Sequence, residues 1–166
     1  MKVHTIFSSL AVLSCAAVFS ACGNTGDSSE VPETLFQGEY DGASMDAAME
    51  QARGTLGHFR DVLAANSGEN HAIKVAIQDG DQIEHFWLVE VLPVGDGFKG
   101  ILNNEPGLVS NVEIGDEIEA VGEDISDWLY FLDDQMHGNY TLRVMLPGMP
   151  AEEAEFYRAT LAPLPD

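Results

Sequence analysis

Two residues of opposite charge, Asp127 and Arg143, stand in segments where they could meet. Asp127 lies on the apolar side of a predicted strand, where a carboxylate without a partner would be costly. Arg143, one of only seven Lys or Arg residues in the chain, lies on a later predicted strand. We therefore expect a buried ion pair between them. In the functional alternative, the Arg143 guanidinium binds a ligand carboxylate or phosphate, and Asp127 holds it in place.

A wider polar set comprises Glu84, Asn103, Asp127 and Arg143, which we take as a candidate binding or structural cluster. Asn103 opens the run Asn-Asn-Glu-Pro-Gly, which is typical of a turn. An enzymatic alternative would use Glu84, Asp127 or His137 in a small hydrolase. The chain lacks the Gly-x-Ser-x-Gly pattern of a serine hydrolase, and we predict no catalytic residue.

The composition argues against a metal site and against nucleic acid. The histidines at positions 58, 71, 85 and 137 do not have the spacing of metal ligands, and no phosphate-binding glycine loop occurs. We predict neither a metal nor another cofactor. The chain has 28 Asp and Glu residues against 7 Lys and Arg, a formal charge of −21. Such a surface repels phosphate backbones, so nucleic acid is excluded as a partner, whereas small cations and basic proteins are not.

The element that would position these residues from the N-terminal side is a helix. Ser44 can cap its first turn, and Asn66-Ser67-Gly68 ends it. Apolar residues recur along it at helical spacing, at positions 45, 49, 52, 56, 59 and 63. Gly54 and Gly57 weaken this helix, each by about 1 kcal/mol relative to alanine.

The remaining elements are mainly strands. Alternating apolar residues and regularly spaced turns predict strands over 73–78, 82–92, 98–103, 117–121, 125–132 and 140–146. A last helix begins at Pro150 and ends before Pro163. Trp87 and Trp128 are expected to pack in the core. The sequence thus predicts an α+β fold: a mainly antiparallel sheet of about five to six strands, an N-terminal helix packed on it and a short C-terminal helix.

The N-terminus resembles a bacterial export signal. Lys2 precedes an apolar stretch over 6–19, which is too short to span a membrane. The stretch ends in Phe-Ser-Ala before Cys22, which resembles a lipobox, and we predict a signal peptide over 1–21. The residues before Cys15 also resemble a lipobox, so cleavage before Cys15 is a second possibility. The alternative to lipidation is an ordinary secretory signal peptide that is cut near Ala21.

Cysteine usage supports lipidation at Cys22. Cleavage at that site leaves a single cysteine, which cannot form an internal disulfide, and acylation with a fatty acid such as palmitate explains it. Gly23 favours the periplasmic face of the outer membrane, where the lipid would anchor the protein. Residues 22–43 then form a lipidated, flexible tether, and residues 44–166 form one α+β domain.

Several segments together resemble a known family. They are Met49–Phe59, Ile73-Lys74-Val75, Glu84-His85-Phe86-Trp87-Leu88, Phe98-Lys99-Gly100, Leu102-Asn103, Pro106, Ile125-Ser126-Asp127-Trp128 and Gly138–Arg143. Over about residues 45–148 the chain resembles the YegJ-like family, a bacterial domain of unknown function (DUF2314). The resemblance implies a single α+β domain, sometimes exported, and brings no established activity or cofactor.

The leading functional hypothesis is a non-catalytic module of the cell envelope that binds a protein or a small polar ligand. It rests on the tether, the compact domain and the lack of a catalytic constellation. The enzymatic alternative is given above. A third hypothesis is an immunity-like inhibitor of an envelope toxin, because an acidic surface suits a basic target.

Overall fold

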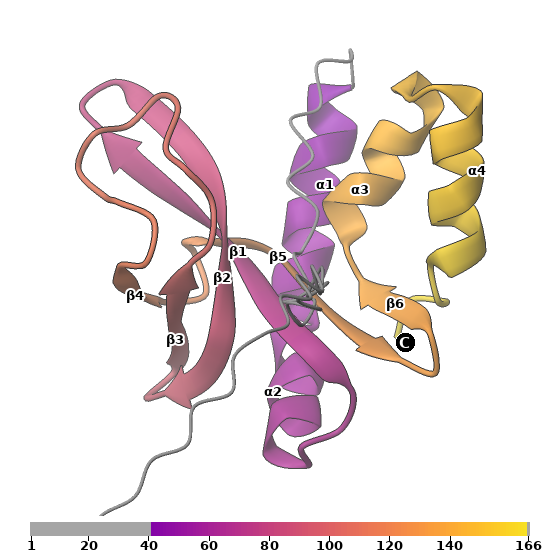
Figure 1. Cartoon of the computed structure of the whole chain (residues 1–166), viewed down its shortest axis with the longest axis horizontal. Helices are drawn as coiled ribbons and strands as arrows, with labels where there is room; N and C mark the ends of the chain where they lie inside the picture. Colours follow the sequence, from indigo (N-terminus) through magenta and orange to yellow (C-terminus); the bar gives the residue numbers. More distant parts are fainter. Residues whose placement is uncertain (1–40, 166) are drawn as a thin grey trace, which may run out of the picture.

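The computed structural model describes residues 41–165, so the predicted signal peptide, Cys22 and the tether up to residue 40 lie outside the described residues. Within them the fold is α+β, as predicted, and six antiparallel strands form one sheet in the order β4-β3-β2-β1-β5-β6 (Figure 1). The elements in chain order are α1 (Gly42–Gly54), α2 (Leu56–Ala64), β1 (Glu69–Asp79), β2 (Gln82–Val94), β3 (Gly97–Leu102), β4 (Glu117–Ala120), β5 (Ile125–Leu132), β6 (Gln135–Gly138), α3 (Tyr140–Met145), the 3-10 turn η1 (Leu146–Gly148) and α4 (Ala151–Thr160).

Helices pack on both faces of the sheet. On one face, α1 and α2 bury Ala52 and Phe59 against residues of β1, β2 and β5 that include Trp128. On the other face, α3, η1 and α4 pack on the side that carries Ala72 and Trp87. Both tryptophans are buried, as predicted. Figure 1 shows the β1–β2 hairpin on one side of α1 and the pair α3 and α4 on the other. No helix in residues 41–165 is long and apolar enough to cross a membrane.

The N-terminal helical segment differs from the prediction in two ways. It begins at Gly42, and its cap is Asp41, whose carboxylate accepts a hydrogen bond from the Ser44 amide at 2.8 Å. It also breaks at Thr55, between α1 and α2. The indole N–H of Trp128 donates to the Ala52 carbonyl at 3.0 Å and to the Thr55 hydroxyl at 3.1 Å. The break therefore coincides with a contact to β5 that the local sequence does not reveal.

Five of the predicted strands are confirmed, and the sixth is wrong. The segment predicted as a strand over 140–146 is the helix α3 followed by η1, while the sixth strand is the short β6. The chain turns between them at Gly138 and Asn139, which have φ of 76° and 50°. Two successive residues in the left-handed region end the extended conformation, and α3 starts directly after them.

Candidate functional site

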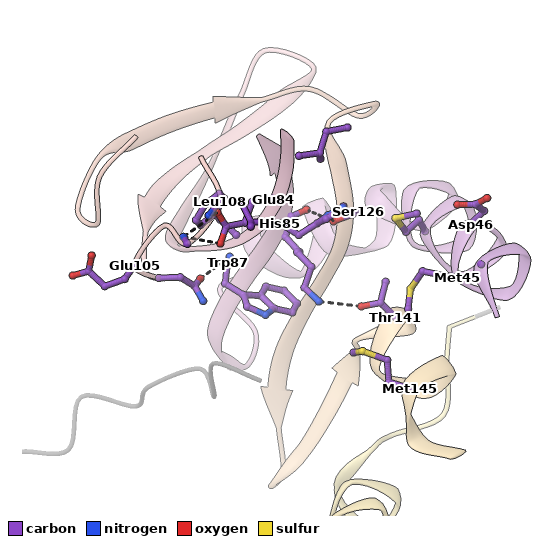
Figure 2. A pocket seen from close by; sticks show the side chains of 17 residues that line it. Met45, Asp46, Glu84, His85, Trp87, Glu105, Leu108, Ser126, Thr141 and Met145 are labelled. Carbon is purple, nitrogen blue, oxygen red and sulfur yellow. Dashed lines mark hydrogen bonds between the residues drawn. The ribbon is translucent and has the colours of Figure 1, made fainter. Parts of the chain in front are cut away.

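A hollow of the described structure lies between the β1–β2 hairpin and the helices α1 and α3 (Figure 2). Its volume is about 700 Å³, which suits a small organic molecule. The 17 residues that line it are Gly42, Met45, Asp46, Met49, Lys74, Ile83, Glu84, His85, Phe86, Trp87, Asn104, Glu105, Gly107, Leu108, Ser126, Thr141 and Met145.

Much of the cavity wall is apolar. Met45 and Met49 extend from α1, Met145 extends from α3, and the Trp87 ring faces them from β2. Methionine side chains are flexible and adapt to different apolar shapes. Leu108 at the edge of the cavity is 63% exposed. The wall therefore offers apolar contact area to a bound molecule.

Lys74 is the one cation among the lining residues. Its ammonium donates a hydrogen bond to the Thr141 hydroxyl at 3.1 Å and lies 4.6 Å from the centre of the Trp87 ring. Burial lowers the pKa of Lys74, and the negative charge of Asp127 opposes this shift. An ammonium group has three N–H donors, and the bond to Thr141 uses one of them. Lys74 was not among the site residues predicted from the sequence.

Asp127 is fully buried and is bonded to the start of α3. One carboxylate oxygen accepts from the Trp128 and Tyr140 amides at 2.9 and 3.0 Å. The other accepts from the Thr141 amide at 2.8 Å and from its hydroxyl at 2.6 Å. Burial raises the pKa of Asp127, and the Lys74 charge and the bonds from Thr141 and Tyr140 oppose this shift. Four donors surround the group, and an ionised carboxylate, which only accepts, matches them.

The predicted ion pair between Asp127 and Arg143 is wrong. Within residues 41–165, Arg143 donates instead to two backbone carbonyls, those of Gly138 at 3.2 and 3.3 Å and Ala162 at 2.7 Å. The cause is the helical conformation of α3. Two residues of a helix are separated by about 200° of rotation, so Arg143 points away from the side on which Thr141 meets Asp127.

Glu84 stands at the edge of the cavity and holds a loop. Its carboxylate accepts from the backbone amides of Gly107, Leu108 and Val109 at 2.8 to 3.2 Å. Burial opposes ionisation, but these amides together lower the pKa of Glu84. Successive amides around a carboxylate form an anion-binding nest. Glu84 therefore fixes the loop that follows β3, and its charge is already matched by donors.

In the predicted turn after β3, the side chain that makes a polar contact at the cavity belongs to Asn104 and not to the predicted Asn103. The side-chain oxygen of Asn104 accepts from the Trp87 amide at 3.0 Å, and Asn104 lines the cavity. The neighbouring Asn103 donates through its backbone amide to the Trp87 carbonyl at 3.0 Å. Of the predicted polar set, the structure thus brings Glu84 to the cavity wall and Asp127 beneath it. It does not bring the Asn103 or Arg143 side chain to the wall.

His85 and Ser126 form a second polar contact at the cavity that the sequence did not predict. The Nδ1 atom of His85 lies 2.9 Å from the Ser126 hydroxyl, which donates to the Lys74 carbonyl at 3.2 Å. Burial lowers the pKa of His85, as do the charges of Lys74 and Arg53. The pairing of β1 with β5 shifts register between Lys74 and Val75. Simple alternation along the strands therefore could not place Ser126.

The residues of the enzymatic hypothesis are not assembled into one site. His137 lies outside the cavity lining and stacks on the Tyr130 ring at 4.7 Å. Asp127 is enclosed by four donors, and Glu84 is bound to its loop. Among residues 41–165, no group of three His, Cys, Asp or Glu side chains could hold a metal ion.

The model of a protein family described as uncharacterized and conserved in bacteria (DUF2314) matches residues 42–162. The chain belongs to this DUF2314 family. It is 40% identical over 137 residues to the uncharacterized protein YegJ of Escherichia coli K12, an alignment that covers 82% of this chain and 90% of that protein. It is 37% identical over 76 residues to a putative ankyrin repeat protein of Neisseria meningitidis serogroup B, covering 46% of this chain and 30% of that protein. No solved structure matches.

The segments by which the sequence resembles the DUF2314 family meet at the cavity. Lys74 comes from the first strand segment, His85 and Trp87 from the second, Ser126 from the third, and Thr141 from the segment that forms α3. These segments are far apart in the chain, and the antiparallel pairing of β1 with β2 and β5 brings them together. The cavity is therefore the best candidate for the functional site of the domain.

Proposed function

We propose that this chain is an exported lipoprotein of the cell envelope whose DUF2314 domain binds a small ligand in the cavity and catalyses no reaction. The observation that carries the binding proposal is the cavity itself, with one partly compensated ammonium group among apolar walls. A hollow of about 700 Å³ with a few placed polar groups is the usual form of a small-molecule site.

An enzyme would also show a cavity with converging polar groups and a carboxylate of shifted pKa. The details favour binding. Ser126 is 1% exposed and donates to a backbone carbonyl, so its hydroxyl is not presented to a substrate. The lone pairs of Asp127 are engaged by four donors, which leaves it neither a base nor a nucleophile. Burial raises the pKa of Asp127, and the hydrogen bonds that anchor α3 oppose this shift, so the shift has a structural explanation.

The location in the envelope is supported by the sequence alone. The apolar stretch over 6–19, the lipobox-like residues and the single cysteine left after cleavage are typical of a bacterial lipoprotein. The described domain begins at α1, whose first residue, Gly42, lines the cavity. We propose the periplasmic face of the outer membrane as its site.

Replacing the lipidation residue tests the location. The variant Cys22→Ser should move the protein from the membrane fraction to the soluble fraction, because serine cannot form the thioether that carries the lipid. Cys15→Ser is the matched control and should leave the protein in the membrane fraction. The measurement is fractionation with mass spectrometry of the N-terminal peptide. An unchanged distribution of Cys22→Ser, with no acyl mass on the wild type, would contradict the proposal.

Filling the cavity tests binding. Met45 is half-buried on α1 and lines the cavity, so Met45→Trp should occupy the space that a ligand needs. Native mass spectrometry of protein purified from envelope extracts should show a small-molecule adduct on the wild type and on the control Leu92→Trp, whose position on β2 is 56% exposed and outside the cavity. The adduct should be lost from Met45→Trp. A wild type without adduct, or an adduct that survives in Met45→Trp, would refute the proposal.

A further inference from the structure

The proposed binding function can be deepened to a ligand class. We propose that the ligand is an uncharged amphipathic small molecule, which places a carbonyl oxygen against the Lys74 ammonium and its apolar part among Met45, Met49 and Met145. This inference rests on the proposed function, because it assumes that the cavity is a binding site. It specifies which chemistry the cavity selects.

The N–H donors of Lys74 indicate that the polar end of the ligand is a hydrogen-bond acceptor. The ammonium is held by Thr141 and lies over the face of Trp87, so its position is fixed by two neighbours. The bond to Thr141 uses one of its three N–H groups, and Lys74 lines the cavity. A bound molecule must supply an acceptor there, because desolvating an ammonium without one would be costly.

The charge of the ligand follows from the carboxylates around Lys74. Asp127 is linked to Lys74 through the Thr141 hydroxyl, which accepts from the ammonium and donates to the carboxylate. The positive charge is therefore already partly compensated within the protein. Asp46 and Glu105 also line the cavity, and the whole chain carries a formal charge of −21. These carboxylates would repel an anionic head group, and the Lys74 ammonium would repel a cationic one.

The apolar part of the proposed ligand is inferred from the cavity wall that the three methionines form. The three methionines lie on α1 and α3, and Figure 2 shows Met45 and Met145 across the cavity from Trp87. The Lys74 ammonium lies 4.6 Å from the centre of the Trp87 ring. A molecule with its carbonyl at Lys74 would extend its hydrocarbon part toward them. Thioether side chains gain contact with hydrocarbon without requiring one shape. A neutral carbonyl head with an aliphatic body satisfies both walls at once.

Three probes with the same eight-carbon chain test the class: octanamide, octanoate and octylamine. The chain has two tryptophans, and Trp87 lines the cavity, whereas the Trp128 indole is bonded to Ala52 inside the core. Nitrogen–proton NMR spectra resolve the two indole signals. Titration with octanamide should shift the Trp87 signal and leave the Trp128 signal in place. Octanamide should bind at least about tenfold more tightly than octylamine, which has no acceptor for the Lys74 ammonium. It should bind more tightly than octanoate by a similar factor of about ten, because the surrounding carboxylates repel a carboxylate head group.

Variants assign the selectivity to Lys74. Lys74→Met should weaken octanamide binding at least about tenfold, and the control Lys99→Met, at a surface pair with Glu117, should not. Met45→Trp should weaken the binding of all three probes.

If Lys74→Met fails to fold, the order of the affinities of the three probes for the wild type still tests the ligand class. Tighter binding of octanoate or octylamine, or equal binding of all three, overturns the ligand class. If no probe binds while the native adduct is present, only the ligand class fails; if the adduct is also absent, the proposed function fails.

Discussion

Replacing Asp127 with asparagine should lower the free energy of unfolding by about 3–5 kcal/mol, because it disrupts a buried charged group with four hydrogen-bond donors. The Asp127 carboxylate accepts four hydrogen bonds, and the asparagine NH2 group would face two of these donors instead of accepting from them. The ammonium of Lys74 would also lose its balancing charge. Urea unfolding, followed by tryptophan fluorescence, measures the change.

Controls separate this role from a general effect of the substitution. Asp61→Asn, at an exposed position of α2, should change the unfolding free energy by less than about 0.5 kcal/mol. A double-mutant cycle of Asp127→Asn with Lys74→Met should give a clear coupling energy, whereas the cycle with Arg143→Met should be additive within about 0.5 kcal/mol. Strong coupling to Arg143, or an Asp127→Asn variant as stable as the wild type, would contradict the hydrogen bonds described for Asp127.

The same carboxylate explains why part of the fold could not be predicted from the sequence. Residues 140–146 carry apolar side chains at alternating positions, a pattern that favours a strand: Tyr140, Leu142, Val144 and Leu146. They form α3 because Asp127, 13 residues before Tyr140, accepts from the first amides of the helix. A capping residue so distant in sequence leaves no local signal. The strands β1 to β5 were predictable because their alternation and turns are local properties.

The candidate site was predicted only in part, for a similar reason. Glu84 and Asp127 were identified because charged residues stand out on apolar strands. Lys74 could not be placed, since its neighbours became known only with the register of β1 against β2 and β5. The register shift beside Lys74 places Ser126 at the cavity and Asp127 opposite Lys74. Bulges of this kind reorient side chains and are frequent near functional sites, but the strand pattern alone does not reveal them.

The turn into α3 should tolerate no side chain at Gly138. Its φ of 76° lies in the left-handed region, where an alanine costs about 1–2 kcal/mol. A Cβ at this position would overlap the Trp128 carbonyl oxygen and would lie 2.5 and 2.7 Å from two carbons of the Trp128 ring. Overpacking of this kind adds about 1–3 kcal/mol. Gly138→Ala should therefore lower the free energy of unfolding by the sum of the two terms, measured by urea unfolding.

Gly80 provides the matched control for this prediction. It also has a positive φ, 59°, at the turn between β1 and β2, but a Cβ there would meet nothing within 4 Å. Gly80→Ala should then show only the conformational cost of about 1–2 kcal/mol. The difference between the two variants measures the contact of Gly138 with Trp128. Because the amide of Asn139 donates to the same Trp128 carbonyl, a displaced Gly138 should also disturb the position of Thr141 and weaken octanamide binding. Equal destabilisation by the two substitutions would show that the approach of Gly138 to Trp128 is not close in solution.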